Sequence, residues 1–345
     1  MAPMPFRLPR RAAAFAAALV AALGVTACAP SSGPAYDPSA PIADEVPAGT
    51  VITVADQQSI LKTMLTASGE AAKLGFGVKF ADFAGGPAIL ESFRADATQV
   101  AIVADVPPIH AQIARFPSPI IKAWQLDRGG VSTVARPGVP LRTPADLRGR
   151  KIGYAEGTAH QAMVLRLLRA AGLSKHDVQL VPLQLTEVGE ALGAGQIDIA
   201  PLMEPISTKY RLAHPDAQVL PDRISQAAQS GLMFLYSPQA ALADPARAAA
   251  LKRLSAAIDR ARAWVDADKN RWVDTYYAGA LKIPAAVGRI AYDGQGSWRS
   301  VPLDPALVAR QQDTIDTLAA FGEIPGGRIS ADGSVDFRFD THPAT

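Results

Sequence analysis

The chain alternates between short strand-like runs and longer helix-like runs, and this pattern constrains its fold more than any other feature. The first series contains VITVA from Val51, a helical stretch from Gln58 to Lys73, then GVKFADF and QVAIVAD. After an irregular stretch a second series follows, with KIGYA, a helix from Thr158 to Ala171, then VQLVPL and IDIAPL. Such alternation is typical of α/β proteins in which crossover helices connect parallel strands.

The two series predict two sheets and therefore two lobes. At Asp244 the character of the sequence changes, and two long helical segments, residues 245–268 and 304–321, dominate the remainder. We expect these helices to pack on the first lobe. The predicted first lobe comprises residues 50–134 plus 230–345, and the second comprises residues 135–229. The chain would cross between the lobes twice, and the crossings would form a hinge beside a cleft.

The N-terminus predicts export. Arg7, Arg10 and Arg11 precede an apolar run from Ala12 to Val25, which is the pattern of a secretory signal peptide over residues 1–27. The run leads into Val-Thr-Ala-Cys, the lipobox pattern of bacterial lipoproteins, so we expect Cys28 to carry a lipid. The alternatives are a plain signal peptide with an incidental cysteine, or an uncleaved anchor helix, for which fourteen apolar residues are short.

A linker is predicted between the leader and the first strand. Residues 28–49 are rich in Pro, Ser, Ala and Gly, and their prolines are too closely spaced for a helix or a central strand. We therefore expect a disordered linker that connects a lipidated N-terminus to the lobes. The expected location is the cell envelope, either at the outer face of the membrane or in the periplasm.

Cysteine content and charge exclude several functions. Cys28 is the only cysteine, so the chain can form no internal disulfide and has no paired Cys/His spacing for zinc. Three of the 34 basic residues lie in the leader, which leaves 31 against 32 acidic residues, and no basic run follows Cys28. Binding to a phosphate backbone needs a concentrated basic surface, so we expect no nucleic-acid partner. We also expect no metal site.

Loops at predicted strand ends carry the candidate binding residues, because ligands of open α/β sheets bind beyond the carboxyl ends of strands and near helix N-termini. After GVKFADF, Gly85 and Gly86 turn into a helix and form either an anion nest or a plain tight turn. After VAIVA, Asp105 either caps the helix that Pro107 and Pro108 begin or lines the cleft.

Two further loops lie in the predicted second lobe. In EGTAH the Thr158 hydroxyl and the free N–H groups that follow it would face an anion, and His160 either adds a donor or is a surface or packing residue. In PLMEPIS, Pro205 breaks the strand. Glu204 there either accepts hydrogen bonds from a ligand or is a solvated loop acid.

Four stretches together resemble the aliphatic-sulfonate binding proteins, which are related to taurine, nitrate and thiamine-precursor binding proteins. The first contains a Gly-Pro turn, a helix that ends in a small-residue loop, and Asp-x-Pro-Pro-Ile, all at the family's spacing. The resemblance spans nearly all of the chain after the leader. The stretches are residues 83–112, TPADLRGRKIGYAEGTAHQAMVLRLLRAAGLSKHDVQLVPL at 143–183, GQIDIAPLMEP at 195–205, and PLDPALVARQQDTIDTLAAFGEIP at 302–325.

The resemblance implies a two-lobed, type II periplasmic-binding-protein-like fold that closes on its ligand and delivers it to an ABC permease and its ATPase. It implies a monomer that binds a small anionic organic solute such as an aliphatic sulfonate. The chain departs from the family's pattern where Gly85 replaces Ser, Val103-Ala104 replaces Thr-Gly, and Met203-Glu204 replaces Trp-Asp. Carried over residue by residue, the ligand cleft comprises Gln57, Gly85, Gly86, Asp105, Thr158, His160 and Glu204.

Other functions remain open on the same fold. The ligand could be taurine, nitrate or a thiamine-precursor pyrimidine, and the chain could act as a ligand-sensing domain that docks on a receptor. One branch of the fold family makes a thiamine pyrimidine, so an enzyme is a rival class. The chain contains no His-Glu-x-x-His, Gly-x-Ser-x-Gly or Gly-x-x-x-x-Gly-Lys motif. We therefore expect no enzyme, no catalytic residues and no cofactor.

Overall fold

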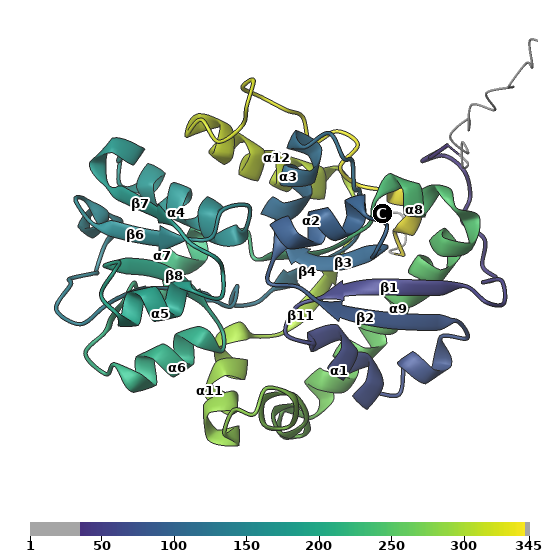
Figure 1. Ribbon diagram of the computed structural model, residues 1–345, viewed down its shortest axis with the longest axis horizontal. Coiled ribbons are helices and arrows are strands. Elements are labelled where there is room, and N and C mark those ends of the chain that lie inside the picture. Colours follow the sequence, from purple (N-terminus) through teal and green to yellow (C-terminus); the bar gives the residue numbers. More distant parts are fainter. Residues whose placement is uncertain (1–34, 342–345) are drawn as a thin grey trace, which may run out of the picture. The chain divides into compact units, whose positions relative to one another are not determined.

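Two mixed sheets form the cores of two lobes in the computed structural model, which describes residues 35–341 (Figure 1). The first sheet has the order β11-β4-β10-β3-β1-β2 and the second β7-β6-β8-β5-β9. The first contains β1 Val51–Asp56, β2 Gly77–Asp82, β3 Val100–Ala104, β4 Ile120–Leu126, β10 Leu232–Tyr236 and β11 Trp298–Val301. The second contains β5 Val131–Ala135, β6 Lys151–Tyr154, β7 Gln179–Pro182, β8 Ile199–Met203 and β9 Gln218–Val219.

The helices follow the strands in the predicted alternation. They are α1 Ile60–Ala67, α2 Gly86–Arg94, α3 Val106–Ile113, α4 Ala159–Ala170, α5 Val188–Gly193, α6 Ile206–Ala213, α7 Asp222–Ala227, α8 Gln239–Ala243, α9 Pro245–Ala267, α10 Lys269–Trp272, α11 Ala285–Gln295 and α12 Pro305–Ala320. A π-helix, Val273–Ala280, follows α10 directly. Short 3-10 turns occupy Ala71–Lys73, Pro144–Leu147, Lys175–Asp177 and Phe337–Phe339.

Strand pairing confirms the predicted parallel units and adds antiparallel strands. β1 pairs in parallel with β2 and β3, and β6 with β7 and β8. β10 pairs antiparallel with both β3 and β4, and β5 with both β8 and β9. The antiparallel strands β5 and β10 each follow a passage from one sheet to the other. The α/β fold class with two lobes is therefore confirmed.

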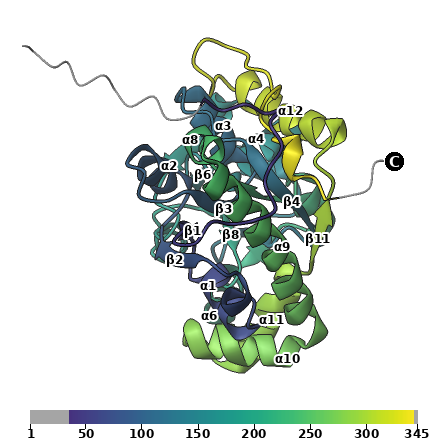
Figure 2. The same cartoon turned by 90° about the vertical axis from the view of Figure 1, so that its right-hand side faces the viewer.

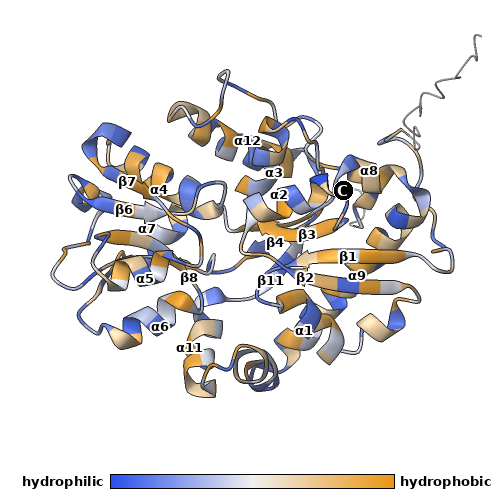
Figure 3. Ribbon diagram, in the orientation of Figure 1, coloured by the Kyte–Doolittle hydropathy of each residue, from blue (hydrophilic) through white to orange (hydrophobic). Residues whose placement is uncertain are grey.

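Apolar strands form the interior of the first sheet. β1 and β3 are mostly orange in Figure 3, and Ile52, Val54, Val100 and Ile102 are almost completely buried. The long helix α9 contacts β1 and α1, and its Leu251, Leu254 and Ile258 belong to the same core. Strands buried on both faces need such near-continuous apolar runs.

Two adjacent segments, residues 127–130 and 229–231, connect the sheets. Gln229 donates a hydrogen bond from Nε2 to the carbonyl oxygen of Val131 (2.9 Å), and Leu126 N–H donates to Gly231 O (2.8 Å). Gly129 has a left-handed backbone with φ of +70°, and a Cβ there would lie 2.5 Å from Gln229 Oε1. The left-handed backbone therefore favours glycine where the segments meet. The first segment precedes Val131, so it lies a few residues before the predicted lobe boundary at 134.

A third region joins the lobes. Helix α12 packs against α4, and α3 also contacts α4. One buried apolar cluster includes Ile109 of α3, Leu168 of α4, and Ile315 and Leu318 of α12. The C-terminal helix, predicted to pack on the first lobe, thus shares its core with the second lobe as well.

Part of the predicted linker packs on the first lobe. Tyr36, Ile42 and Val46 contact the larger core, and Asp44 forms an ion pair with Lys252 of α9 (2.9 Å). Figure 2 shows the purple chain beside α9. Apolar residues at intervals among the prolines explain this packing, so the expected disorder does not extend to residues 35–49. Cys28 and the leader lie outside the described residues. Within residues 35–341 no helix is long and apolar enough to cross a membrane.

Candidate ligand-binding site

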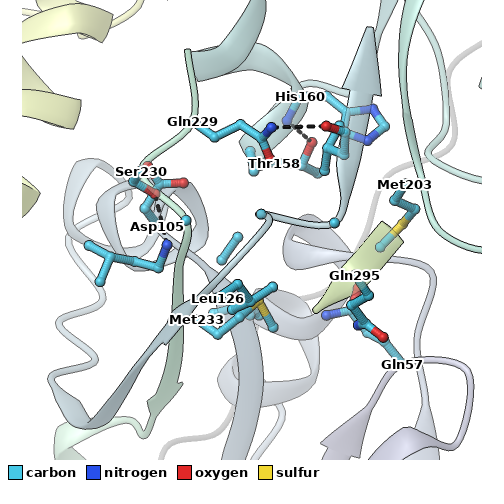
Figure 4. Close-up of a pocket in the computed structure, with 18 of the residues that line it drawn as sticks. Gln57, Asp105, Leu126, Thr158, His160, Met203, Gln229, Ser230, Met233 and Gln295 are labelled. Atoms are coloured by element: carbon cyan, nitrogen blue, oxygen red, sulfur yellow. Dashed lines mark hydrogen bonds between the residues drawn. The ribbon is translucent and has the colours of Figure 1, made fainter. Parts of the chain in front are cut away.

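A pocket of about 1170 Å³, measured to its open mouth, lies where the two sheets meet. Both connecting segments line it, through Gly129, Gly130, Gln229, Ser230 and Gly231. Six of the seven ligand-binding residues predicted from the sequence also line it: Gln57, Gly86, Asp105, Thr158, His160 and Glu204. Figure 4 labels four of them, Gln57, Asp105, Thr158 and His160. Gly85 instead lines a neighbouring cavity, which Thr158 also borders. The structure thus brings the predicted residues together, and their contact with a ligand stays a prediction.

Gln57 is held at the end of β1. Its Nε2 donates to the carbonyl oxygen of Ile102 in β3 (2.9 Å). The next two residues, Gln58 and Ser59, have positive φ values of 53°, and Tyr276 of the π-helix donates from its hydroxyl to Gln58 O (3.2 Å). Tyr276 itself lines the pocket, a role that no sequence motif indicates.

Two helix N-termini face each other across the lobes. Gly86 begins α2 of the first lobe, and a Cβ there would lie 2.7 Å from Pro107 Cγ and 3.1 Å from the carbonyl oxygen of Gly157 in the second lobe. Thr158 caps α4: its hydroxyl accepts from His160 N–H (3.2 Å) and donates to Ala155 O (2.7 Å). The Thr158 hydroxyl is thus already engaged in its own turn. A ligand at this position would meet the partial positive charge of the helix N-terminus.

His160 lines the pocket beside Thr158, and its ring nitrogens form no hydrogen bonds within residues 35–341. Its side chain is 4% exposed, and neither Nδ1 nor Nε2 has a hydrogen-bond partner among the described residues. Burial lowers the pKa of the imidazole to about 4, so the ring is neutral at pH 7. A neutral imidazole offers one N–H donor and one acceptor, and leaving both unpaired in a buried place is costly.

Asp105 lines the pocket and does not cap α3, so the capping interpretation is wrong. Its backbone has helical φ and ψ angles, and the carboxylate turns instead toward α12 and α4. Oδ2 accepts from the Thr314 hydroxyl (2.9 Å) and lies 3.4 Å from Arg166 Nη1. Pro107 and Pro108 have no backbone N–H, so the first turn of α3 offers fewer hydrogen-bond donors to a capping side chain.

Arg166 lines the same pocket, and our sequence interpretation missed it. Ala159, Met163 and Arg166 are spaced four and three residues apart on α4, so they share one helical face, and all three line the pocket. That spacing, counted from Ala159 directly after the helix cap, is the signal that could have identified Arg166.

Glu204 follows β8 and is half-buried. Its Oε2 accepts from Thr208 N–H (3.2 Å), and burial raises the pKa of the carboxyl group. A Cβ on Gly294 of α11 would lie 2.8 Å from Glu204 Oε1, so α11 approaches the carboxylate closely. Glu204 is therefore a partly exposed acid packed beside α11, and its contact with a ligand stays a prediction.

Apolar side chains form most of the remaining wall. Met163, Met203 and Met233 contribute three thioethers from three different elements, and Leu126 and Trp298 lie on the pocket as well. Methionine adapts to varied apolar shapes, so the wall suits a ligand with an apolar body. Within residues 35–341 no cluster of His, Cys, Asp or Glu could hold a metal ion.

A pocket lined from two α/β lobes, beside the segments that connect them, defines the class of two-lobed proteins with the periplasmic-binding-protein fold. Among solved structures, the alkanesulfonate-binding protein SsuA of Xanthomonas axonopodis pv. citri, bound to MOPS, has a TM-score of 0.72 at 21% identity and covers 83% of this chain and 98% of its own. The periplasmic aliphatic sulphonate binding protein SsuA of Escherichia coli has a TM-score of 0.70 at 22% identity, with 84% and 96% covered.

Sequence comparison gives the particular relationship. Residues 123–267 match the NMT1/THI5 like family model. The chain is also 24% identical over 239 residues to an Escherichia coli (strain K12) protein named as an aliphatic sulfonates-binding protein, which covers 69% of this chain and 73% of that protein. The chain is therefore homologous to the SsuA aliphatic sulfonate-binding proteins, and the resemblance seen in the sequence is confirmed.

Proposed function

We propose that this chain is the extracytoplasmic solute-binding lipoprotein of an ABC-type importer and that it captures a small organic solute with an anionic head. The observation that carries the proposal is the pocket itself, because residues of both lobes and of both connecting segments surround it. A ligand that touches both lobes stabilises their closed arrangement selectively. The relatives are named as sulfonate-binding proteins, and this supports an acidic head group on the ligand.

The pocket supports an organic solute more than nitrate. Its three methionines and its other apolar side chains suit a ligand with an apolar body, which nitrate lacks. We place the acidic head on the α4 side of the pocket, where the neutral His160 imidazole can donate one hydrogen bond. The single carboxylate of Glu204 is then available to an N–H or O–H group elsewhere on the ligand.

The ligand assignment is tested with two probes, an alkanesulfonate and an aminoalkanesulfonate of equal chain length. Glu204→Gln keeps the shape of the side chain and removes its charge, so it should weaken the amine-bearing probe by about 10- to 100-fold, the value of a charged hydrogen bond. The plain alkanesulfonate should lose much less. Calorimetry with both probes on wild type and variant measures the difference. Equal losses for the two probes would remove Glu204 from ligand selection.

The proposed lipid anchor is tested separately. Cleavage before Cys28 would leave a thiol that carries the acyl chains, and several chains hold a protein on a membrane where one chain holds it only marginally. Cys28→Ala should therefore release the protein into the soluble fraction. A variant that loses its leader and still sediments with membranes would contradict the anchor.

A further inference from the structure

Arg166 is the only lysine or arginine among the described residues that line the pocket. Its side chain is 8% exposed, and it comes from the same helix whose N-terminus carries Thr158 and His160. The other charged side chains on the described wall are those of Asp105 and Glu204. The positive charge that attracts an acidic ligand therefore comes from Arg166, and Asp105 reduces it.

Arg166 lies farther from the two neighbouring carboxylates than from the Thr314 hydroxyl. Nη2 donates to Thr314 Oγ1 at 2.7 Å, whereas the distances to Asp313 Oδ2 and Asp105 Oδ2 are 3.3 and 3.4 Å. Charged N–H to carboxylate bonds are usually about 2.7–2.9 Å. These three bonds leave two of the five N–H groups of the guanidinium without a partner among the described residues.

Asp105 is anchored independently of Arg166. Its Oδ2 accepts from the Thr314 hydroxyl at 2.9 Å, and Gln311 Nε2 donates to its backbone carbonyl oxygen at 2.8 Å. Its side chain is 2% exposed, so it is a buried carboxylate beside a buried cation. Asp313, the other carboxylate near Arg166, is 59% exposed and therefore screened by water.

We propose that Arg166 is the cationic anchor for the acidic head of the ligand, and that Asp105 is its counter-ion and not a ligand contact. This inference rests on the proposed function. In the empty pocket Asp105 prevents Arg166 from being an unpaired buried charge. When an anion binds, it receives the free N–H groups of Arg166, and Asp105 keeps its hydrogen bond from Thr314. Asp105 repels that anion, so its charge lowers the affinity of the pocket for acids.

The inference gives opposite effects for two substitutions in one ion pair. Arg166→Gln should weaken the binding of 1-butanesulfonate by about 10- to 100-fold, because it removes a charged donor. Asp105→Asn keeps the acceptor for Thr314, removes the repulsion and should tighten binding by about 5- to 10-fold. The affinity for the matched neutral probe, butyl methyl sulfone, should change by less than about threefold in either variant. A loss of sulfonate affinity in Asp105→Asn would overturn the assignment.

A second measurement uses inorganic sulfate, so that the assignment can be judged apart from the organic ligand. Sulfate should raise the unfolding temperature of Asp105→Asn more than that of wild type, because binding to the native state stabilises it. The double variant Asp105→Asn/Arg166→Gln has no buried unpaired charge and should lose this response. Equal responses in all three proteins would overturn the roles of the pair. A wild type that responds to sulfate but binds no sulfonate would contradict the proposed function alone.

Discussion

At the scale of single residues, His160 and Arg166 determine the polar character of one end of the pocket. The loop EGTAH identifies His160 as a candidate by its sequence alone, because its position follows directly from the helix start at Thr158. Arg166 lies two turns further along α4, and many side chains of that helix are buried without facing the pocket. Sequence spacing shows which residues share a face, but the packing of the lobes decides which face borders the pocket.

The buried His160 should make stability depend on pH. The folded-state pKa of His160, about 4, lies below the usual value of 6.5. Between these values the unfolded chain binds a proton that the folded protein does not, so the unfolding free energy is highest above pH 6.5 and falls as the pH drops toward 4. The shift corresponds to about 3 kcal/mol. We expect wild type to lose unfolding free energy relative to His160→Gln over this range, as measured by urea denaturation. The exposed His176 provides the control substitution His176→Gln. A wild-type to His160→Gln difference that is constant from pH 7 to 4 would contradict the burial argument.

At the scale of elements, β4 shows where a strand escapes prediction from sequence. The segment IIKAWQL has a lysine at its third position, which interrupts the apolar run, so the pattern predicts an irregular region there. In the structure Lys122 is 3% exposed and its Nζ lies 2.7 Å from Asp259 Oδ2 of α9. Trp124 Nε1 donates to the other oxygen of the same carboxylate (2.7 Å). A partner 137 positions away in the chain compensates the buried charge, and local sequence does not reveal it.

Removing Asp259 from the Lys122–Asp259 ion pair should cost more unfolding free energy than removing Lys122. Asp259→Ala leaves a buried ammonium whose other described contact is Thr341 Oγ1 at 3.5 Å, so we expect a loss of about 3 kcal/mol or more. Lys122→Met leaves a carboxylate that is a third exposed and still bound to Trp124, and should cost about 1 kcal/mol. Urea denaturation of both variants and of the double variant measures the difference. Equal losses in the two single variants would contradict the asymmetry.

Other elements follow from local chemistry. Thr143 and Asp146 form the capping box of the turn Pro144–Leu147, and α4, α9 and α12 end within about one residue of their predicted limits. Strand β11 and the π-helix were not predicted. β11 has four residues and pairs only with β4 in the described sheet, so its sequence carries little periodic signal. The pocket residue Tyr276 is placed by the π-helix, which no sequence motif indicates, and so it was missed as well.

At the scale of the whole molecule, the lobes approach each other closely at Gly294 of α11 and Glu204 after β8. Gly294→Leu adds a side chain where even a Cβ would lie 2.8 Å from the carboxylate, and so it should hold the lobes apart. We expect a larger radius of gyration with ligand and an affinity reduced by about tenfold or more. X-ray scattering and calorimetry measure both quantities.

The control for this prediction lies on the same helix. Ala286 of α11 is exposed, so Ala286→Leu places a leucine of the same size on the solvent-facing surface of that helix. That variant should keep the affinity and the radius of wild type. If Gly294→Leu shows the same radius and affinity as Ala286→Leu, the contact between Gly294 and Glu204 does not limit closure.

The packing of residues 35–49 on the first lobe has a consequence for how far the protein can travel. With Cys28 lipidated as proposed, seven residues, 28–34, span the distance from the bilayer to the folded chain, and at full extension they reach roughly 25 Å. The first lobe would then stay near the lipid surface. Under this proposal capture would take place close to the membrane that holds the importer, and delivery would depend on lateral diffusion in two dimensions and on a high effective concentration.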